Sequence, residues 1–354
     1  MSNQFKSLLK KVGSGSHTSK KLTRQEAALA MRLMLTQTAT PAQIGAFLIA
    51  HRIMRPTGTE LAGMLDAYDD LGPNIPALAL AKPVTMLSQP YDGRDRTIPL
   101  SPLTALVLAA AGYPVLQHGG DQMPTKYGMP LIDLWQGLGV DWRGLTLAQV
   151  HDRLTQTQVG FVYLPEQFPQ AQGLVPYREE IGKRPPIATL ELIWSPYDGP
   201  RQIVAGFVHP PTEGMIRDAL FLRGERQFTT IKGLEGSCDL PRDRPAIIGL
   251  YSLDSGEMQF NRLCLHARDY GLGGKDPAWT TLPAAIALMQ DTLAGKETEL
   301  LPSLLWNSGF HLWQLGQLTD ITAGIELARS LLQSQQVAQK LSQLRGDVDK
   351  ASLS

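Results

Sequence analysis

The segment 84–140 constrains the fold most, because it alternates short apolar runs with a helix in a fixed order. Val84–Leu87 is apolar and ends in a polar loop, and a helix rich in alanine and leucine begins at Ser101. Pro114–Leu116 is apolar again and ends in the polar loop Gln117–Asp121. This order starts an α/β unit, in which ligands bind beyond the carboxyl ends of the strands. Both polar loops lie at that end, so we expect them to face one cleft.

The same alternation continues downstream. Apolar runs of strand length predict further strands at Val159–Leu164, Gln202–Val208, Phe228–Lys232 and Ala246–Leu250. Helical spacing of apolar residues predicts helices at Pro102–Ala111, Leu131–Leu138, Leu147–Leu154, Glu213–Leu222, Pro283–Leu293 and Thr322–Leu344. Strands that alternate with helices argue for a mainly parallel sheet.

Three capped helices precede this pattern. Thr23–Glu26 and Thr57–Glu60 are capping boxes, and Thr40–Pro41 places a cap before a proline at the first helical position. No strand signal lies among them. We therefore predict an all-helical domain at 23–80, followed by an α/β domain at 81–354.

Residues 1–22 form a basic segment, with five lysines and no acid. Gly13–Ser16 interrupts the charge run. Such runs are usually solvated, so one interpretation is a solvated tail. The other is an arm that contacts a polyanion.

The composition is that of an ordinary globular protein with room for two domains, at 43% apolar and 19% charged residues in 354. A formal net charge of zero argues against nucleic-acid binding by overall charge, but leaves room for a local basic groove. Two cysteines, Cys238 and Cys264, are too few for a disulfide framework or a zinc site and favour a reducing, cytoplasmic compartment. No apolar run reaches the ~18 residues of a membrane span, and no signal-peptide core is present, so no membrane partner is expected.

Basic side chains in three loops are the first candidates for ligand binding. Guanidinium groups match phosphate oxygens with planar donors. The candidates are Arg94, Arg96, Lys126, Arg178 and Arg184, with the turn residues Asp92 and Gly93 beside the first pair. They could line one anionic pocket, or each could be a separate surface charge.

A histidine and two acids complete the candidates. His118 follows a strand and precedes Gly119, which allows close approach of a ligand or simply permits a turn. A lone histidine more often has a structural role. Asp239 and Glu235 share a later loop and give a weak magnesium signal, because magnesium is usually held by one or two carboxylates plus phosphates. The alternative is that both acids are solvated.

Four segments of the chain resemble the anthranilate phosphoribosyltransferase family over nearly the whole length. They read LTRQEAALAMRLMLTQTATPAQIGAFLIAHRI, TIPLSPLTALVLAAAGYPVLQHG, VPYREEIGKR and GLEGSCD. The resemblance implies a helical domain, which includes part of 165–200, plus an α/β domain. It also implies an active site in the cleft between them, and usually a homodimer through the helical domain.

The departures from that family are concentrated in its donor site. The family's G-T-G-G-D loop cradles the pyrophosphate of phosphoribosyl pyrophosphate through backbone N–H groups, and here Gln89–Gly93 brings a proline without an N–H. N-x-S-T becomes Pro99–Pro102, in which Ser101 keeps one hydroxyl, and K-H-G-N becomes Gln117–Gly120. The metal-binding D-E pair becomes Cys238-Asp239, with Glu235 as the preceding acid.

These changes remove several groups that would stabilise the leaving pyrophosphate. Losing one such donor typically costs about 2.7–4 kcal/mol of transition-state stabilisation. The ordinary reaction should therefore be severely impaired even if the individual losses do not add up fully. His118 and Arg178, which match positions that the family uses on the acceptor side, remain. Arg94 and Arg96 are additions.

Two main hypotheses follow, beside a third in which the chain is a scaffold dimer with a vestigial cleft. In the first, the cleft has a degenerate donor and metal site, lacks the tryptophan-pathway activity and binds phosphate-bearing ligands, most plausibly DNA or RNA, as in the divergent nucleic-acid-binding branch that the sequence resembles. In the alternative, the chain is an active enzyme that transfers a phosphoribosyl group from phosphoribosyl pyrophosphate to anthranilate or another aromatic acceptor. Mg²⁺ is expected only in the alternative, and no catalytic residue is assigned in either.

Overall fold

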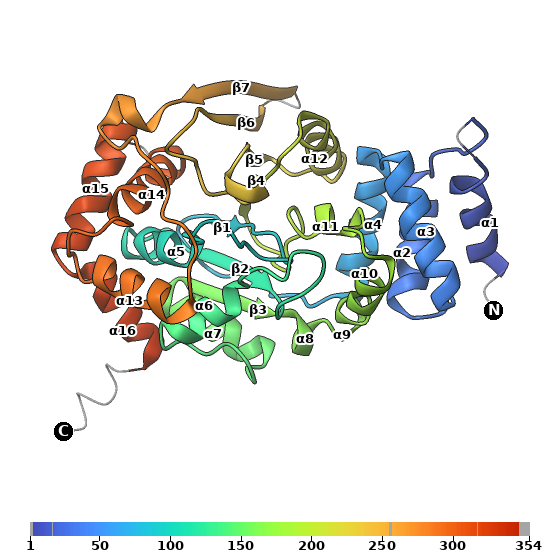
Figure 1. The fold of residues 1–354 in the computed structure, drawn as a ribbon, viewed down its shortest axis with the longest axis horizontal. Helices are drawn as coiled ribbons and strands as arrows, with labels where there is room; N and C mark the ends of the chain where they lie inside the picture. The colour runs from blue at the N-terminus through green and yellow to red at the C-terminus, as the bar shows by residue number, and fades with distance from the viewer. Residues whose placement is uncertain (1–2, 16, 255–256, 317, 347–354) are drawn as a thin grey trace.

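Four helices at one end of the molecule form a bundle. The computed structural model describes residues 3–15, 17–254, 257–316 and 318–346, and Figure 1 shows the bundle in blue. Its helices are α1 (Asn3–Val12), α2 (Arg24–Leu35), α3 (Pro41–Met54) and α4 (Gly58–Leu71). Thr23, Thr40 and Thr57 each close a capping box, so local sequence fixes where α2, α3 and α4 begin.

The helix α1 lies within the basic N-terminal segment. Phe5, Leu8 and Val12 share one face at helical spacing and are buried. Phe5 packs on Phe47 of α3, with ring centroids 5.4 Å apart. The solvated-tail interpretation is therefore wrong for residues 3–12, because apolar side chains between the lysines attach them to the bundle.

A seven-stranded sheet forms the centre of the second domain. Its order is β3-β2-β1-β4-β5-β6-β7, with the first five strands parallel and the last two joined antiparallel. The strands are β1 (Val84–Leu87), β2 (Val115–Gly119), β3 (Val159–Tyr163), β4 (Arg201–Gly206), β5 (Gln227–Ile231), β6 (Ala246–Asp254) and β7 (Glu257–Leu265). The predicted fold class, an all-helical N-terminal domain plus an α/β domain with a mainly parallel sheet, is confirmed. The sequence did not predict β7, because this edge strand is mostly exposed and carries no apolar run.

Helices cover both faces of the sheet. They are α5 (Ser101–Ala110), α6 (Leu131–Gly137), α7 (Leu147–Thr157), α8 (Leu164–Gln167), α9 (Pro169–Gln172), α10 (Val175–Ile181), α11 (Ile187–Leu190), α12 (Pro210–Leu222), α13 (Leu282–Leu293), α14 (Leu301–Leu315), α15 (Ile321–Gln333) and α16 (Gln336–Arg345), with short 3₁₀ turns η1 (Leu234–Gly236) and η2 (Ala267–Tyr270). The single helix expected at 322–344 is two helices, because Gln335 has a left-handed backbone with φ 63°.

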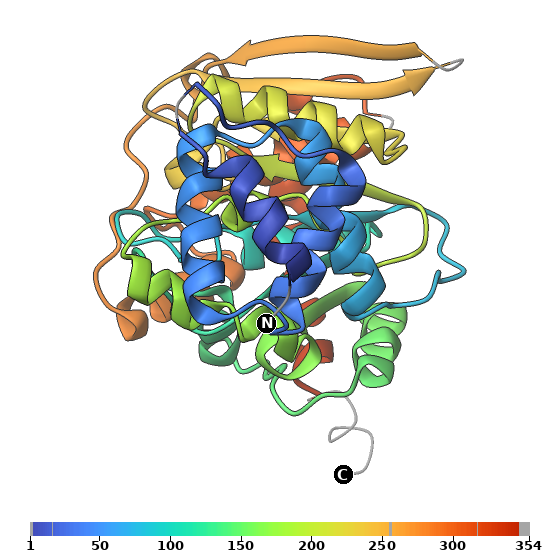
Figure 2. The same ribbon diagram turned by 90° about the vertical axis from the view of Figure 1, so that its right-hand side faces the viewer.

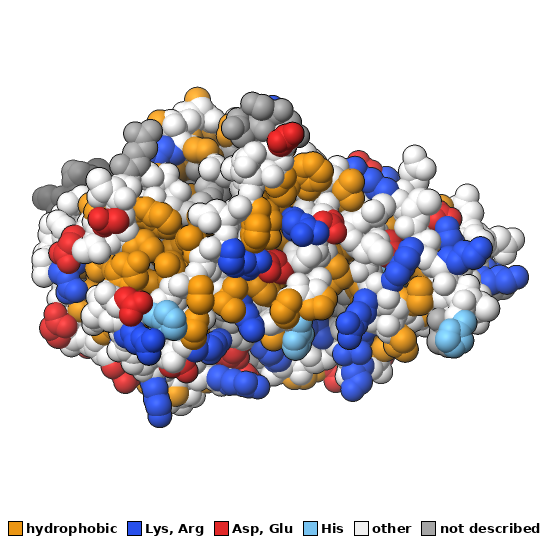
Figure 3. All heavy atoms as spheres, turned by 90° about the horizontal axis from the view of Figure 1, so that it is seen from above, with side chains coloured by type: hydrophobic (Ala, Val, Ile, Leu, Met, Phe, Trp, Pro, Cys, Tyr) orange, Lys and Arg blue, Asp and Glu red, His pale blue; other side chains and the backbone are white. Residues whose placement is uncertain are grey.

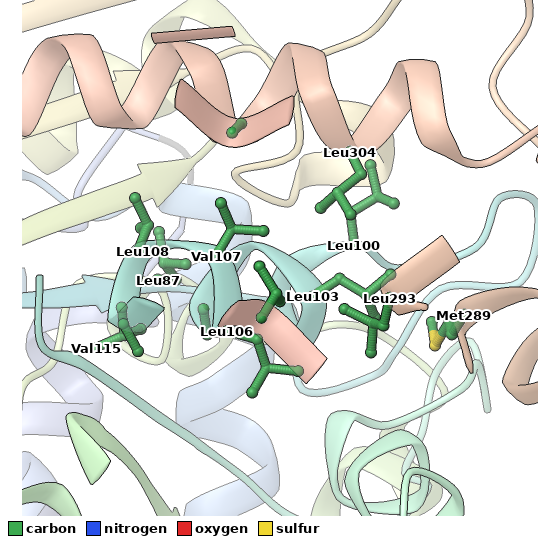
Figure 4. Close-up of a cluster of buried hydrophobic side chains, with 14 of the residues drawn as sticks. Leu87, Leu100, Leu103, Leu106, Val107, Leu108, Val115, Met289, Leu293 and Leu304 are labelled. Carbon is green, nitrogen blue, oxygen red and sulfur yellow. The ribbon is translucent and has the colours of Figure 1, made fainter. Parts of the chain in front are cut away.

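The helix α5 is the centre of the main core. All of its residues from Ser101 to Ala109 are buried. Figure 4 shows Leu103, Leu106 and Val107 among side chains from the sheet and from α13 and α14. A helix that is apolar on every side has to be enclosed by other elements, and this enclosure fixes the start of α5 at the edge of the cleft.

The two domains meet along α3, α4, α10, α11 and α12. α10 contacts α3, whereas α11 and α12 contact α4. Seen from the bundle end, α1–α4 form a layer in front of the sheet, with the β6–β7 ribbon along the top (Figure 2). In the part of the chain that the structure describes, no helix is long and apolar enough to cross a membrane.

Candidate functional site

The loops after β1, β2 and β5 meet at the carboxyl edge of the sheet, as the sequence predicted for the first two. The Gly128 N–H of the second loop donates to the Asp92 carbonyl of the first at 2.9 Å. Gly93 has φ 74°, and a Cβ there would lie 2.3 Å from the Gly128 carbonyl carbon. Glycine is therefore required at position 93 so that the two loops can touch, which is a structural reason independent of any ligand.

Arg94 lies on the two carboxylates that the sequence marked as a weak metal site. Its guanidinium is 1% exposed; one terminal nitrogen donates to Asp239, and its Nε lies 3.5 Å from Glu235 Oε1. The other terminal nitrogen donates to Thr97. Asp239 also accepts from the Leu100 N–H at 2.9 Å. Arg94 is thus an internal counter-ion of the carboxylate pair, and its guanidinium does not project into open space.

Glu235 is held by the backbone of the first loop. Its carboxylate accepts N–H groups from Asp95, Arg96 and Thr97 at 3.1–3.3 Å. Burial alone would raise the pKa of Glu235, but the Asp95 N–H and the Arg94 charge outweigh burial and lower it to about 2. Glu235 also has φ 54°, unusual for a residue other than glycine. Three successive N–H groups of this kind are an anion-binding arrangement, and the protein's own carboxylate fills it.

This carboxylate pair does not fit a magnesium ion in the arrangement observed. Both oxygens of each carboxylate already accept hydrogen bonds from protein donors. Elsewhere in the described ranges, no group of three or more His, Cys, Asp or Glu side chains could hold a metal ion. An ion at Asp239 and Glu235 would first require Arg94 to leave.

The remaining cations of the two loops differ in exposure. Lys126 Nζ lies 3.7 Å from Glu235 Oε2, so it joins the same cluster. Two cations then balance two carboxylates, Asp239 and Glu235, and the cluster has no surplus positive charge. Arg96 is exposed and contributes only its backbone to the cluster.

His118, at the end of β2, is enclosed by aromatic side chains. It lies between Tyr91 and Trp194, with ring centroids 5.5 and 5.2 Å away. Its Nε2 lies 3.1 Å from the Trp194 carbonyl and must donate there, because a carbonyl oxygen can only accept. Its Nδ1 then accepts a hydrogen bond from the Tyr91 hydroxyl. Burial lowers the pKa of His118 to about 4, so the ring is neutral at pH 7. Both ring nitrogens are used inside the protein.

Arg178, on α10, also has an internal partner. It is buried and forms an ion pair with Glu191, with a further contact of 3.3 Å to the sulfur of Met123. Burial lowers the pKa of Arg178. The charge that the family resemblance assigned to the acceptor side is therefore neutralised within the chain.

Two predicted site residues have polar atoms without partners. Asp92 is buried, and within the described part of the chain neither of its carboxylate oxygens has a hydrogen bond; Arg184 Nη1 lies 3.8 Å from Oδ1. The hydroxyl of Ser101, at the start of α5, is also buried and without a hydrogen bond among the described residues. Gly119 is buried beside Phe161. Asp92 and Ser101 are thus buried predicted residues with unsatisfied polar atoms, whereas Arg96 and Arg184 keep guanidinium groups that are at least partly exposed.

Sequence reasoning missed the internal partners. Glu191 pairs with Arg178 across one turn and loop, and Thr97 and Gln89 bind Arg94 and Asp239. Gln89 lies in the altered loop after β1. Glu191 is a single acid in an apolar stretch, and this isolated charge was the one sequence signal for a buried ion pair.

Comparisons with known proteins agree with this architecture. Residues 6–72 match the helical bundle domain of a glycosyl transferase family, and residues 92–337 match the α/β domain of that family. Anthranilate phosphoribosyltransferase of Leptothrix cholodnii is 27% identical over 88% of this chain and 89% of its own, and that of a Bradyrhizobium species is 26% identical over 97% and 98%. The structure is similar to anthranilate phosphoribosyltransferase of Saccharomyces cerevisiae in complex with phosphoribosyl pyrophosphate and Mg, with a TM-score of 0.81, 16% identity and 98% coverage of each chain. The Thermus thermophilus enzyme gives 0.74, 20% identity, and coverage of 98% of this chain and 99% of its own.

Proposed function

Since the chain belongs to the glycosyl transferase family defined by these helical bundle and α/β domains, we propose that its interdomain cleft binds phosphate-bearing ligands without a divalent metal ion. One observation carries this proposal: the guanidinium of Arg94 occupies the carboxylate pair Asp239 and Glu235. A metal-dependent donor would have to displace a buried, hydrogen-bonded ion pair. Breaking such a pair typically costs about 3–5 kcal/mol.

The acceptor side supports the same proposal. Glu191 neutralises Arg178, and both nitrogens of His118 are engaged by Tyr91 and Trp194. Among the described residues, His118 has no free ring nitrogen, and Arg178 keeps only its buried Nε without a hydrogen bond. Ordinary phosphoribosyl transfer would therefore need rearrangement at both ends of the cleft.

Nucleic acid is the ligand class that we favour. Its phosphates can be met by arginines as fixed charges, without a metal ion. Figure 3 shows Lys and Arg side chains along one long edge of the face it presents, with Asp and Glu side chains between some of them. Anisotropy titration with short DNA and RNA strands at two salt concentrations tests this, because each neutralised phosphate steepens the salt dependence. No binding at micromolar protein, or binding indifferent to salt, argues against nucleic acid.

The second candidate is phosphoribosyl transfer to anthranilate or another aromatic acceptor. The comparisons favour it more than the first, because the relatives described above carry the name of that enzyme and one solved relative is a complex with phosphoribosyl pyrophosphate and Mg. In this candidate, Arg94 leaves the carboxylates when donor and metal bind. A homodimer through the helical bundle, as the family resemblance implies, is proposed for both candidates.

Calorimetry with phosphoribosyl pyrophosphate separates the two. The first candidate predicts heats that do not depend on added MgCl₂, and no loss of anthranilate fluorescence in a turnover assay. Magnesium-dependent binding together with consumption of anthranilate would establish the second candidate instead. Arg94→Ala is the informative variant, because it frees the carboxylate pair in either case.

A further inference from the structure

A pocket between the two domains combines free cations with an apolar wall. Its volume is about 560 Å³, within the range of small-molecule sites. Arg52 and Arg55 lie at the end of α3 and just after it, and Arg184 lies in the segment before α11. Phe207 and Val208 directly follow β4. Gly236 also lines the pocket, which therefore opens beside the Glu235 cluster.

The charge of this pocket differs from that of the neutral cluster next to it. Arg52, Arg55 and Arg184 line it, and no Asp or Glu is among its lining residues in the part of the chain described. Arg52 and Arg55 are exposed and have no ion pair among the described residues, and Arg184 has only the contact of 3.8 Å with Asp92. The surplus positive charge of the cleft is therefore here.

The backbone holds these arginines in place. Arg52 Nε donates to the Arg184 carbonyl at 3.1 Å, which joins α3 to the segment before α11. Arg55 has φ 55°, a left-handed backbone that L residues rarely adopt. Lys21 Nζ donates to the Met54 carbonyl at 2.5 Å and also to that of Arg55. The last turn of α3 is thereby fixed with Arg52 and Arg55 at the pocket.

Proline and valine side chains form an apolar wall of the pocket. Proline rings fix the backbone and offer no N–H, so they present a preorganised surface without competing donors. Five of them line the pocket, together with Val208, which is 45% exposed: Pro56, Pro185, Pro186, Pro210 and Pro211. A phosphate alone would leave this wall and most of the volume unused.

We propose that this pocket binds a nucleotide, with its phosphate on Arg52, Arg55 and Arg184 and its base against the proline and valine wall. The inference rests on the proposed function and gives it a location that is separate from the neutralised carboxylate cluster. The nucleotide is either a free mononucleotide or one unit of a single strand, because both present the same phosphate and planar base.

The test uses the full-length protein with two probes, ADP followed by calorimetry and a fluorescein-labelled thymidine oligonucleotide followed by anisotropy. The R52A/R55A double variant should weaken both about tenfold or more, and should lower the salt slope for the oligonucleotide by about 0.7 per lost phosphate contact. R52K/R55K should retain most of the affinity because it keeps the charge. R226A is the control, because Arg226 is exposed just before β5, at the opposite edge of the sheet. This variant should bind both probes as tightly as the parent does.

Each outcome decides a separate point. Tight binding of ADP identifies a mononucleotide site, whereas much tighter binding of the oligonucleotide identifies a strand. If the parent binds a probe and R52A/R55A binds it as well as R226A does, this pocket assignment is wrong and the proposed function stands. If the parent binds neither ADP, oligonucleotide nor inorganic pyrophosphate, the proposed function itself fails.

Discussion

Replacing Arg94 by alanine tests the central ion-pair cluster most directly. The substitution leaves Asp239 and Glu235, 3% and 7% exposed, without their main counter-ion. Removing one partner of a buried pair costs about 3–5 kcal/mol, because the other charge stays buried. Each kcal/mol of lost unfolding free energy lowers the melting temperature of a domain by about 2 °C or more, so the melting temperature should fall by roughly 6–10 °C. Thermal unfolding at neutral pH measures this.

Magnesium should then partly restore the variant. With Arg94 gone, the two carboxylates keep their N–H donors but lose their buried counter-charge, which a divalent ion can supply. An ion at ten times its dissociation constant stabilises the folded state by about 1.4 kcal/mol. The parent should gain nothing from MgCl₂, because Arg94 occupies the carboxylates. The comparison is made at constant ionic strength, so that screening is the same in all samples.

Arg143→Ala is the matched control. Arg143 also pairs with two acids, Asp121 and Asp133, at 3.3 and 2.7 Å, but its side chain is 26% exposed. Partly exposed pairs contribute about 0–1 kcal/mol, so this variant should lose little stability and show no magnesium response. An Arg94→Ala protein as stable as the control, or a parent stabilised by magnesium as much as the variant, would refute the assignment of Arg94 as internal counter-ion.

Three further results are expected. The pKa of Glu235 is lowered to about 2, so its contribution to stability is present above the unfolded pKa near 4.5 and is lost as pH falls toward 2. Glu235→Gln should therefore lose about 3 kcal/mol of unfolding free energy at pH 7. In urea titrations, the stability of this variant should fall less steeply with decreasing pH than that of the parent. Gly93→Ala should cost at least about 1–3 kcal/mol, because φ is 74° and the new Cβ would collide with Gly128; unchanged denaturation would contradict the loop contact. Phe5→Ala should cost about 3–5 kcal/mol, since this ring is fully buried against Phe47, and a wild-type melting curve would mean that α1 is detached in solution.

Local signals predicted most of the fold. The capping boxes that begin at Thr23 and Thr57 determine helix starts within a few residues, and β1, at Val84–Leu87, has the predicted bounds. β7 was not predicted, because it is exposed on a sheet edge and carries no apolar run. The helix α14 (Leu301–Leu315) was not predicted either. Gln335 interrupts the last predicted helix through its backbone angle, which composition does not reveal.

The site was harder to predict because its contacts are not local. The sequence placed Arg94 and Lys126 near one another, and the structure brings both to Glu235. It could not show that Arg94 pairs with Asp239, a residue 145 positions away, or that Glu191 neutralises Arg178. A list of charged residues gives the number of charges in a cleft, whereas their pairing, which decides what remains for a ligand, depends on tertiary structure.

The tie between Glu235 and residues 95–97 has a consequence for how the cleft is assembled. It joins the turn after β5 to the loop after β1 across about 140 residues, so it forms only after both halves of the parallel sheet have come together. Contacts of such long sequence separation are made late and slowly. Folding of the sheet and completion of the cleft are thereby coupled. A chain shortened before β5 would lack the Glu235 carboxylate at residues 95–97 and would hold the loop at 89–97 by fewer contacts, among them those with Gly128 and Met129.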